Sequence, residues 1–152
     1  MLAYTVAMAA VLGFTGSREG LSAEQTSRVR AWVEKLVPGQ VHHGDCVGAD
    51  DAFHRLVHSW NLECAVHVHP PSDEKLRAHN AGDVVNPPRP FLERDRNIVN
   101  QSSFLIACPR TRETPRSGTW ATIRYARKKG VPGVIIYSDG TEERFGQPEQ
   151  QV

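Results

Sequence analysis

Three short polar segments of this chain combine glycine with hydroxyl or charged side chains, a composition that suits the binding of a phosphate group. The first segment runs from Gly13 to Arg18 and contains two glycines. Glycine lets the backbone approach an anion closely, while a serine hydroxyl and an arginine fork add donors. We expect a phosphate to be held by Thr15, Gly16, Ser17 and Arg18. The spacing is neither GxGxxG nor a P-loop, so it predicts neither NAD binding nor ATP hydrolysis.

The second segment adds carboxylates to glycine between residues 44 and 51. Its candidate ligand residues are Gly44, Asp45, Gly48 and Asp50. The carboxylates of Asp45 and Asp50 would accept hydrogen bonds from a ribose or a base. For Asp50 the alternative is a helix cap, because aspartate at the start of a helix satisfies free N–H groups.

The third segment, residues 116–120, opens a predicted helix. A helix N-terminus presents unpaired N–H groups and a partial positive charge, which favour a phosphate. Ser117 is the expected N-cap, and Thr119 adds a hydroxyl beside Gly118. Arg116 would neutralise charge, and Trp120 either stacks on a base or packs in the core.

Arginines are concentrated in the same half of the chain. Residues 88–130 carry ten Lys or Arg against three Asp or Glu, whereas the whole chain has a net charge of only +1. We expect Arg94 and Asn97, on the helix before the fourth strand, to lean over the ligand. A local excess of arginine focuses the field on one anion, while a neutral chain disfavours bulk nucleic-acid binding.

The elements that must position these segments alternate between strand and helix. Apolar runs predict five strands, at residues 6–14, 41–44, 64–69, 103–108 and 131–137. Helical spacing predicts four main helices, at about 22–37, 49–60, 91–101 and 118–129. This order is typical of an α/β, Rossmann-like three-layer sandwich with a mainly parallel sheet of about five strands and helices on both faces. Such sheets bind ligands beyond the carboxyl ends of their strands.

Length and composition narrow the class of protein. A chain of 152 residues fits a single domain over residues 1–152, with a peripheral segment from about residue 141 that is either a small edge strand or a frayed tail. No apolar run is long enough for a membrane span. Three widely spaced cysteines without a CxxC pair favour reduced thiols in the cytoplasm. The histidines and cysteines lack any known metal-ligand spacing, so we expect neither a metal nor a cofactor.

Four motifs in order give the chain a resemblance to the SLOG superfamily, which includes the DprA and LOG proteins. Gly16-Ser17-Arg18 resembles the first DprA loop, and Gly48-Ala49-Asp50 with His54 resembles its Gly-Ile-Asp and Ala-His. Phe91-x-x-Arg-x-Arg-x-Ile98 and residues 117–126 are similar to two further DprA patterns. The chain looks like a minimal stand-alone member of this group.

The resemblance implies a protein that binds a nucleotide or nucleotide-derived ligand, such as a nucleoside monophosphate, a cyclic nucleotide or an ADP-ribose-like molecule. LOG relatives cleave the N-glycosidic bond of nucleoside 5′-monophosphates with a glutamate whose position here is Thr122. A hydroxyl cannot replace that carboxylate, which leaves Asp45, Asp50 and Arg94 as catalytic candidates. DprA relatives bind single-stranded DNA, a third hypothesis that the near-zero net charge disfavours. The resemblance also implies a homodimer.

Overall fold

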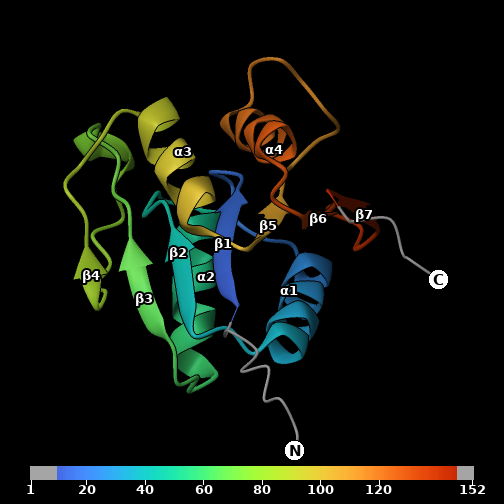
Figure 1. The fold of residues 1–152 in the computed structure, drawn as a ribbon, viewed down its shortest axis with the longest axis horizontal. Coiled ribbons are helices and arrows are strands. Elements are labelled where there is room, and N and C mark those ends of the chain that lie inside the picture. Colours follow the sequence, from blue (N-terminus) through green and yellow to red (C-terminus); the bar gives the residue numbers. More distant parts are fainter. Residues whose placement is uncertain (1–9, 147–152) are drawn as a thin grey trace, which may run out of the picture.

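Strands and helices alternate along the chain to form an α/β fold, which the computed structural model describes for residues 10–146 (Figure 1). The strands are β1 (Val11–Gly16), β2 (Gln40–His43), β3 (Ala65–Val68), β4 (Val84–Val85), β5 (Phe104–Cys108), β6 (Gly133–Ile136) and β7 (Glu142–Phe145). The helices are α1 (Ala23–Leu36), α2 (Ala49–Ser59), α3 (Phe91–Gln101) and α4 (Gly118–Lys129), with a 3-10 turn η1 (Glu74–Leu76).

One sheet holds all the strands, in the order β4-β3-β2-β1-β5-β6-β7. Every neighbouring pair is parallel except β6 and β7. The expected Rossmann-like sandwich is thus confirmed, but the sheet has seven strands where we predicted about five. The two additions are edge strands: β4 has only two residues, and the exposed, charged β7 follows a turn at 139–140, so neither carries a clear apolar pattern.

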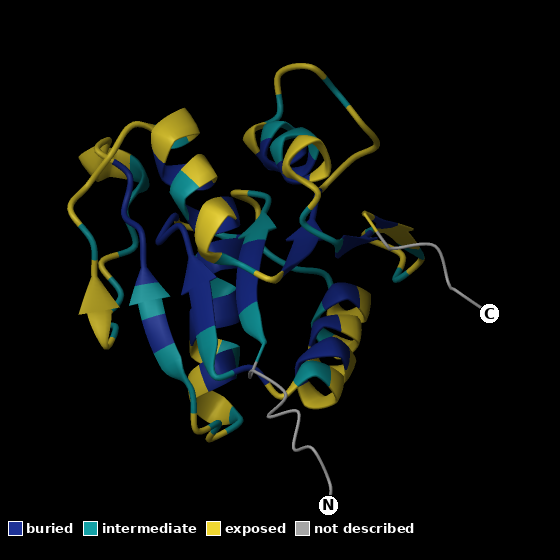
Figure 2. Ribbon diagram, viewed as in Figure 1, coloured by how far each residue is buried: buried dark blue, intermediate teal, exposed yellow. Residues whose placement is uncertain are grey.

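The sheet separates two apolar clusters, because side chains alternate between its faces. In β5, Phe104 and Ile106 join the cluster beneath α1 and α2, whereas Leu105 and Ala107 join the cluster beneath α4. Central strands are buried on both faces, as Figure 2 shows. No helix of the described residues has the length and hydropathy to cross a bilayer.

The path of the chain reverses at β1. From β1 it moves outward through β2 and β3 to β4, and then α3 brings it back to β5 on the other side of β1. A reversal of this kind opens a crevice at the carboxyl ends of the two central strands, because their connections leave in opposite directions. The loops after β1 and β5 therefore border the same space.

Buried histidines line the sheet beside this crevice. His42 Nε2 lies 3.0 Å from the amide oxygen of Gln40, and its Nδ1 lies 2.8 Å from His69 Nε2. With Nε2 donating to Gln40, His42 Nδ1 accepts a hydrogen bond from His69. In this arrangement the His42 ring is neutral, because its Nε2 donates and its Nδ1 accepts, and His69 donates through Nε2.

A second histidine pair joins β2 to α2. The Asp45 backbone N–H donates to His43 Nδ1 at 3.0 Å, so the proton of His43 is on Nε2 and faces His54 Nδ1 at 2.9 Å. His43 is fully buried and His54 is 6% exposed. The two pairs lie on opposite faces of β2, and a proton added to His42 Nδ1 or His54 Nδ1 would remove the hydrogen bond which that nitrogen accepts.

These histidine pairs make the fold sensitive to acid. Burial, with the neighbouring histidines, lowers the pKa of His42 to about 3. Burial likewise lowers the pKa of His69 to about 4 and holds that of His43 well below its usual value. The unfolded chain takes up these protons near pH 6.5, so the free energy of unfolding falls as the pH drops below that value. Burial raises the pKa of Asp50 to about 7 and also raises that of Asp95, which opposes this trend. Burial lowers the pKa of His54 as well, so four histidines outweigh two carboxyl groups.

We predict that the free energy of unfolding, measured by urea denaturation, falls by more than about 1 kcal/mol per pH unit from pH 6 to 4.5. His69→Gln keeps a donor for His42 and removes a titrating group, so its slope should be shallower. His79→Asn is the control, because His79 is exposed and its pair with Glu74 lies on the surface. A wild-type protein with equal stability at pH 7 and pH 5 would contradict this account.

Candidate functional site

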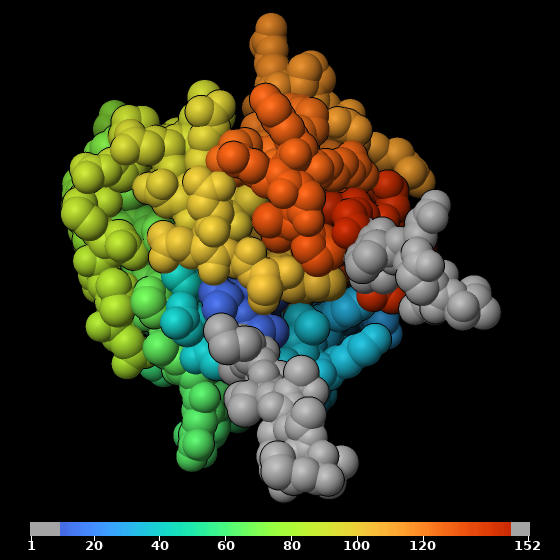
Figure 3. Space-filling model, viewed as in Figure 1, coloured from blue at the N-terminus to red at the C-terminus, as the bar shows by residue number. Residues whose placement is uncertain are grey.

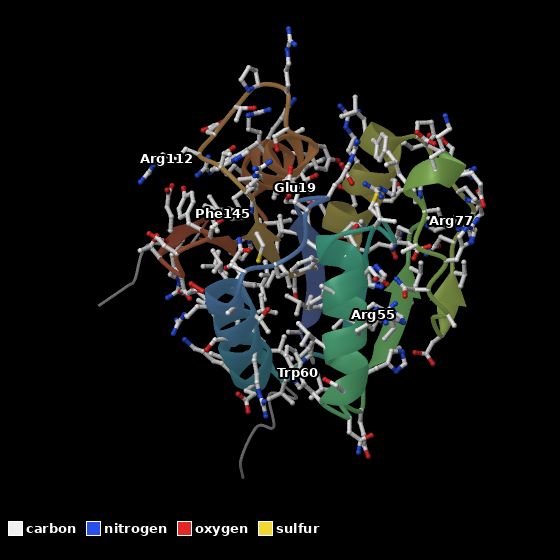
Figure 4. The ribbon with its side chains drawn as sticks, turned by 180° about the vertical axis from the view of Figure 1, so that it is seen from behind. Glu19, Arg55, Trp60, Arg77, Arg112 and Phe145 are labelled. Carbon is white, nitrogen blue, oxygen red and sulfur yellow. The ribbon has the colours of Figure 1, made fainter. Side chains whose placement is uncertain are left out.

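A cavity of about 610 Å³ lies at the carboxyl ends of β1 and β5, where the chain reverses. Three parts of the chain supply most of its wall: the turn after β1, the loop and first turn of α4 after β5, and the inner face of α3. Glu19, labelled in Figure 4, belongs to the first of these and lies above the end of β1. The turns around Gly16 and Gly118 thus border one space, as their positions after adjacent parallel strands predict.

The turn after β1 holds its shape through close packing. A Cβ on Gly16 would lie 2.5 Å from the Ala49 Cβ, so only glycine allows α2 to approach this closely. The Ser17 N–H donates to the Cys108 carbonyl at 3.2 Å, and the Glu19 N–H donates to the Ser17 hydroxyl at 3.0 Å. The Ser17 amide, expected to face a phosphate, is therefore engaged within the protein, as is the neighbouring amide of Glu19.

The first turn of α4 leaves its amides open. Ser117 is the N-cap, as predicted, and its hydroxyl accepts from the Trp120 N–H at 3.2 Å. The N–H groups of Gly118 and Thr119 have no partner within the helix, since the first turn lacks preceding carbonyls. An added Cβ on Gly118 would meet no atom within 4 Å, so there is room for a ligand beside it. This turn is the best-formed anion seat in the cavity wall.

Arg94 forms the floor between α3 and the β2 loop. Its side chain is 7% exposed, and one of its terminal nitrogens donates to the Gly44 carbonyl at 2.6 Å and to the Cys46 sulfur at 3.1 Å. The other terminal nitrogen lies 3.0 Å from Asp95. The Arg94 Nε is buried from solvent and has no hydrogen-bond partner within the protein.

Two buried carboxyl groups flank this arginine. Burial raises the pKa of Asp50 to about 7, although Arg94 and the Cys46 N–H, which donates to it at 3.2 Å, act in the opposite direction. Burial also raises the pKa of Asp95, against the opposing effects of Arg94 and Thr122. At neutral pH the cavity therefore contains a carboxyl group that is poised between its protonated and ionised forms.

The wall of the cavity is rich in arginine. The wall contains four arginines and three carboxyl groups, one of which is the partly protonated Asp50. Arg110, from the loop after β5, forms an ion pair with Glu19 across the opening. The balance of charge favours an anionic ligand.

Most of the residues that we predicted from the sequence line this cavity. They are Thr15, Gly16, Ser17, Arg18, Gly44, Asp50, Arg94, Arg116, Ser117, Gly118 and Thr119. Four others do not: Asp45, Gly48, Asn97 and Trp120. Of these, Trp120 is 2% exposed, and its indole N–H donates to the Thr111 carbonyl at 3.0 Å, so it packs in the core beneath α4.

Asp45 and Gly48 lie outside the cavity wall and hold neighbouring segments of the chain in place. Asp45 is fully buried; its carbonyl and carboxylate accept from the N–H groups of Ala78 and Asn80 at 2.7 and 2.9 Å, which holds the connection before β4. Arg77, beside η1 in Figure 4, lies 3.5 Å from the same carboxylate. A Cβ on Gly48 would lie 2.2 Å from the Arg18 carbonyl oxygen, so Gly48 lets the β1 turn pack against α2.

Several residues of the wall were missed as site residues. Phe91, Arg94, Asp95 and Ile98 share one face of α3, at the i, i+3, i+4, i+7 spacing. Because Arg94 was predicted at the site, the same helical spacing also indicates Phe91 and Asp95 as site residues. The loop residues Arg110, Thr111 and Thr114 carry no such pattern, and only their position after β5 indicates their role.

A metal would find few free ligands here. Among residues 10–146, no group of three histidine, cysteine or carboxylate side chains is arranged to hold an ion. The imidazole nitrogens nearest the site are already engaged in the His42–His69 and His43–His54 pairs.

Comparison with known proteins gives a likeness of fold. Neither a family model nor a curated protein matches this chain. The structure is similar to that of the molybdenum cofactor binding protein from the phototrophic bacterium Rippkaea orientalis, with a TM-score of 0.66 and 17% identity. The match covers 88% of this chain and 79% of that chain. Identity this low speaks for the fold alone, so membership of the SLOG superfamily stays a prediction.

Proposed function

We propose that this cavity binds a nucleotide or nucleotide-derived ligand, with a phosphate seated at the first turn of α4. The observation that carries the proposal is the convergence of the Gly16 and Gly118 turns on one cavity that Arg94 also lines. An anion would satisfy the open amides at the first turn of α4.

The seat at α4 supports a phosphate better than the turn after β1. Gly118 and Thr119 offer two free N–H groups, and the hydroxyl of Thr119 and the guanidinium of Arg116 lie in the same wall. In the turn after β1, the N–H groups of Ser17 and Glu19 already donate hydrogen bonds within the protein. This turn contributes the Arg18 side chain, which would neutralise charge.

The first test is a titration panel by calorimetry. It includes inorganic phosphate, nucleoside monophosphates, ADP-ribose, a cyclic nucleotide and the molybdenum cofactor, the last because it names the protein with the similar fold. We expect submillimolar dissociation constants for at least one phosphorylated organic ligand. Millimolar or weaker binding across the whole panel would refute the proposal.

Substitutions at Gly118 sharpen the test. Gly118→Pro removes one N–H but suits the first helical position, where the extended backbone of Ser117 (ψ 127°) accommodates a following proline. The loss of a charge-assisted hydrogen bond should weaken binding about 10-fold or more. Ala121→Val, one turn along and facing a different groove, is the matched control and should bind like the wild type. Equal affinity of G118P and wild type would place the phosphate elsewhere.

Titration with single-stranded oligonucleotides distinguishes a protein that binds nucleic acid from one that binds a mononucleotide. A groove of about 600 Å³ between α3 and α4, helices that adjoin on the face shown in Figure 3, contains Arg96, Arg124, Lys128 and Lys129. Single-stranded nucleic acid would bind here through its phosphates, with affinity that falls steeply with salt. Oligonucleotides that bind no better than mononucleotides would rule this partner out.

A second candidate function is cleavage of the ligand's N-glycosidic bond, which the state of Asp50 favours. In this reaction the C1′–N bond breaks, water adds to C1′, and the departing base receives a proton. A buried carboxyl group with a pKa of about 7 is suited to donate that proton. Asp45, also predicted as a catalytic candidate, lies outside the cavity wall.

We predict that, if this activity exists, release of free base from nucleoside monophosphates falls about 100-fold or more in Asp50→Asn. The rate should also fall as the pH rises through about 7, because Asp50 then loses the proton that it would donate. Asp51→Asn is the control, since Asp51 pairs with Arg55 on the surface of α2. Chromatography that detects no free base from any monophosphate would remove this candidate and leave the binding proposal intact.

A further inference from the structure

Phe91 is the aromatic side chain of the cavity wall that a ligand can reach. The wall contains two aromatic residues, Phe14 and Phe91. Phe14 is fully buried and stacks on Phe53 with ring centroids 4.3 Å apart. Phe91 is the first residue of α3 and is only partly buried. Trp120, the aromatic residue expected from the sequence, lies in the core.

Two guanidinium groups lie over the Phe91 ring. Arg94, one turn further along α3, is centred 5.1 Å from the ring and is held in place by Gly44 and Asp95. Arg18, from the turn after β1, is centred 5.2 Å from the ring. Arg18 is exposed, and no carboxylate of the described residues forms an ion pair with it. The first cation is therefore fixed and the second is free to move.

A bound phosphate would compete with Phe91 for Arg18. Arg18 belongs to the same wall as the seat at the start of α4. A cation–π contact at an exposed site is weaker than a charge-assisted hydrogen bond between guanidinium and phosphate. An anion in the cavity would thus draw Arg18 away from Phe91 and uncover one face of its ring.

We infer that Phe91 stacks on a planar heteroaromatic ring of the ligand, and that Arg18 couples this stacking to the arrival of the phosphate. The inference rests on the proposed function and specifies the ligand class: a planar heteroaromatic ring joined to a phosphate by a short spacer. Before the anion arrives, Arg18 covers the ring. Afterwards the same arginine holds the phosphate, and the ring is available.

The test compares four probes by calorimetry: inorganic phosphate, ribose 5-phosphate, adenosine and AMP, with other nucleoside monophosphates replacing AMP if the panel above favours them. The wild type should bind the monophosphate about 10-fold more tightly than ribose 5-phosphate, since stacking of one base contributes about that factor. Phe91→Leu should bring this ratio close to one, and Phe91→Trp should maintain it. Leu92→Ala is the matched control, because Leu92 is 61% exposed and belongs to the groove between α3 and α4.

Arg18→Gln tests the coupling. This substitution should weaken the binding of the phosphorylated probes. It should strengthen the binding of adenosine, because the Phe91 ring is then uncovered even without an anion. Equal affinity of the wild type for the monophosphate and ribose 5-phosphate would overturn the stacking while leaving phosphate binding in place. A ratio that survives in F91L would also overturn it, and adenosine binding unchanged or weakened in R18Q would overturn the coupling. Failure of every phosphorylated probe, both here and in the panel above, would refute the proposed function as well.

Discussion

The hydrogen bond from Arg94 to the Gly44 carbonyl, at 2.6 Å, fixes the relation between α3 and the loop after β2. A buried guanidinium is stable only when its donors and charge are compensated, and here a carbonyl, a thiol and Asp95 share that task. Gly44 is required beside it, because an added Cβ would lie 2.6 Å from the guanidinium. The position of α3, and with it of Phe91 and Asp95, depends on this contact.

The topology of the sheet explains why such a contact was needed. The chain leaves the sheet after β4 and returns through α3 to the opposite side of β1, so α3 packs on a face of the sheet against β1 and is remote from β2 in the sequence. A charged side chain that reaches from the helix to the β2 loop links these two parts. Arg94 also lines the cavity, so this structural tie is part of the wall of the proposed ligand site.

The sequence was sufficient for features that follow from local patterns. Buried apolar runs predict the central strands, and Ser117 before Gly118 predicts the start of α4 and its free amides. The sequence did not indicate which residues meet through long-range contacts. Asp45 lies in a glycine-containing loop like a ligand residue, yet it holds the segment around Asn80, 35 positions away. Trp120 was left undecided between stacking and packing, because only the fold shows that its indole faces the core.

Both edges of the sheet resist the addition of further strands. At one edge β4 offers a two-residue ladder; at the other β7 carries Glu142, Glu143 and Arg144 in succession. Short and charged borders are the means by which proteins avoid unwanted pairing between sheets of different molecules. Assembly of copies of this chain into a larger unit, such as the expected dimer, would accordingly be built from its helices, and a continuous intermolecular sheet would be disfavoured.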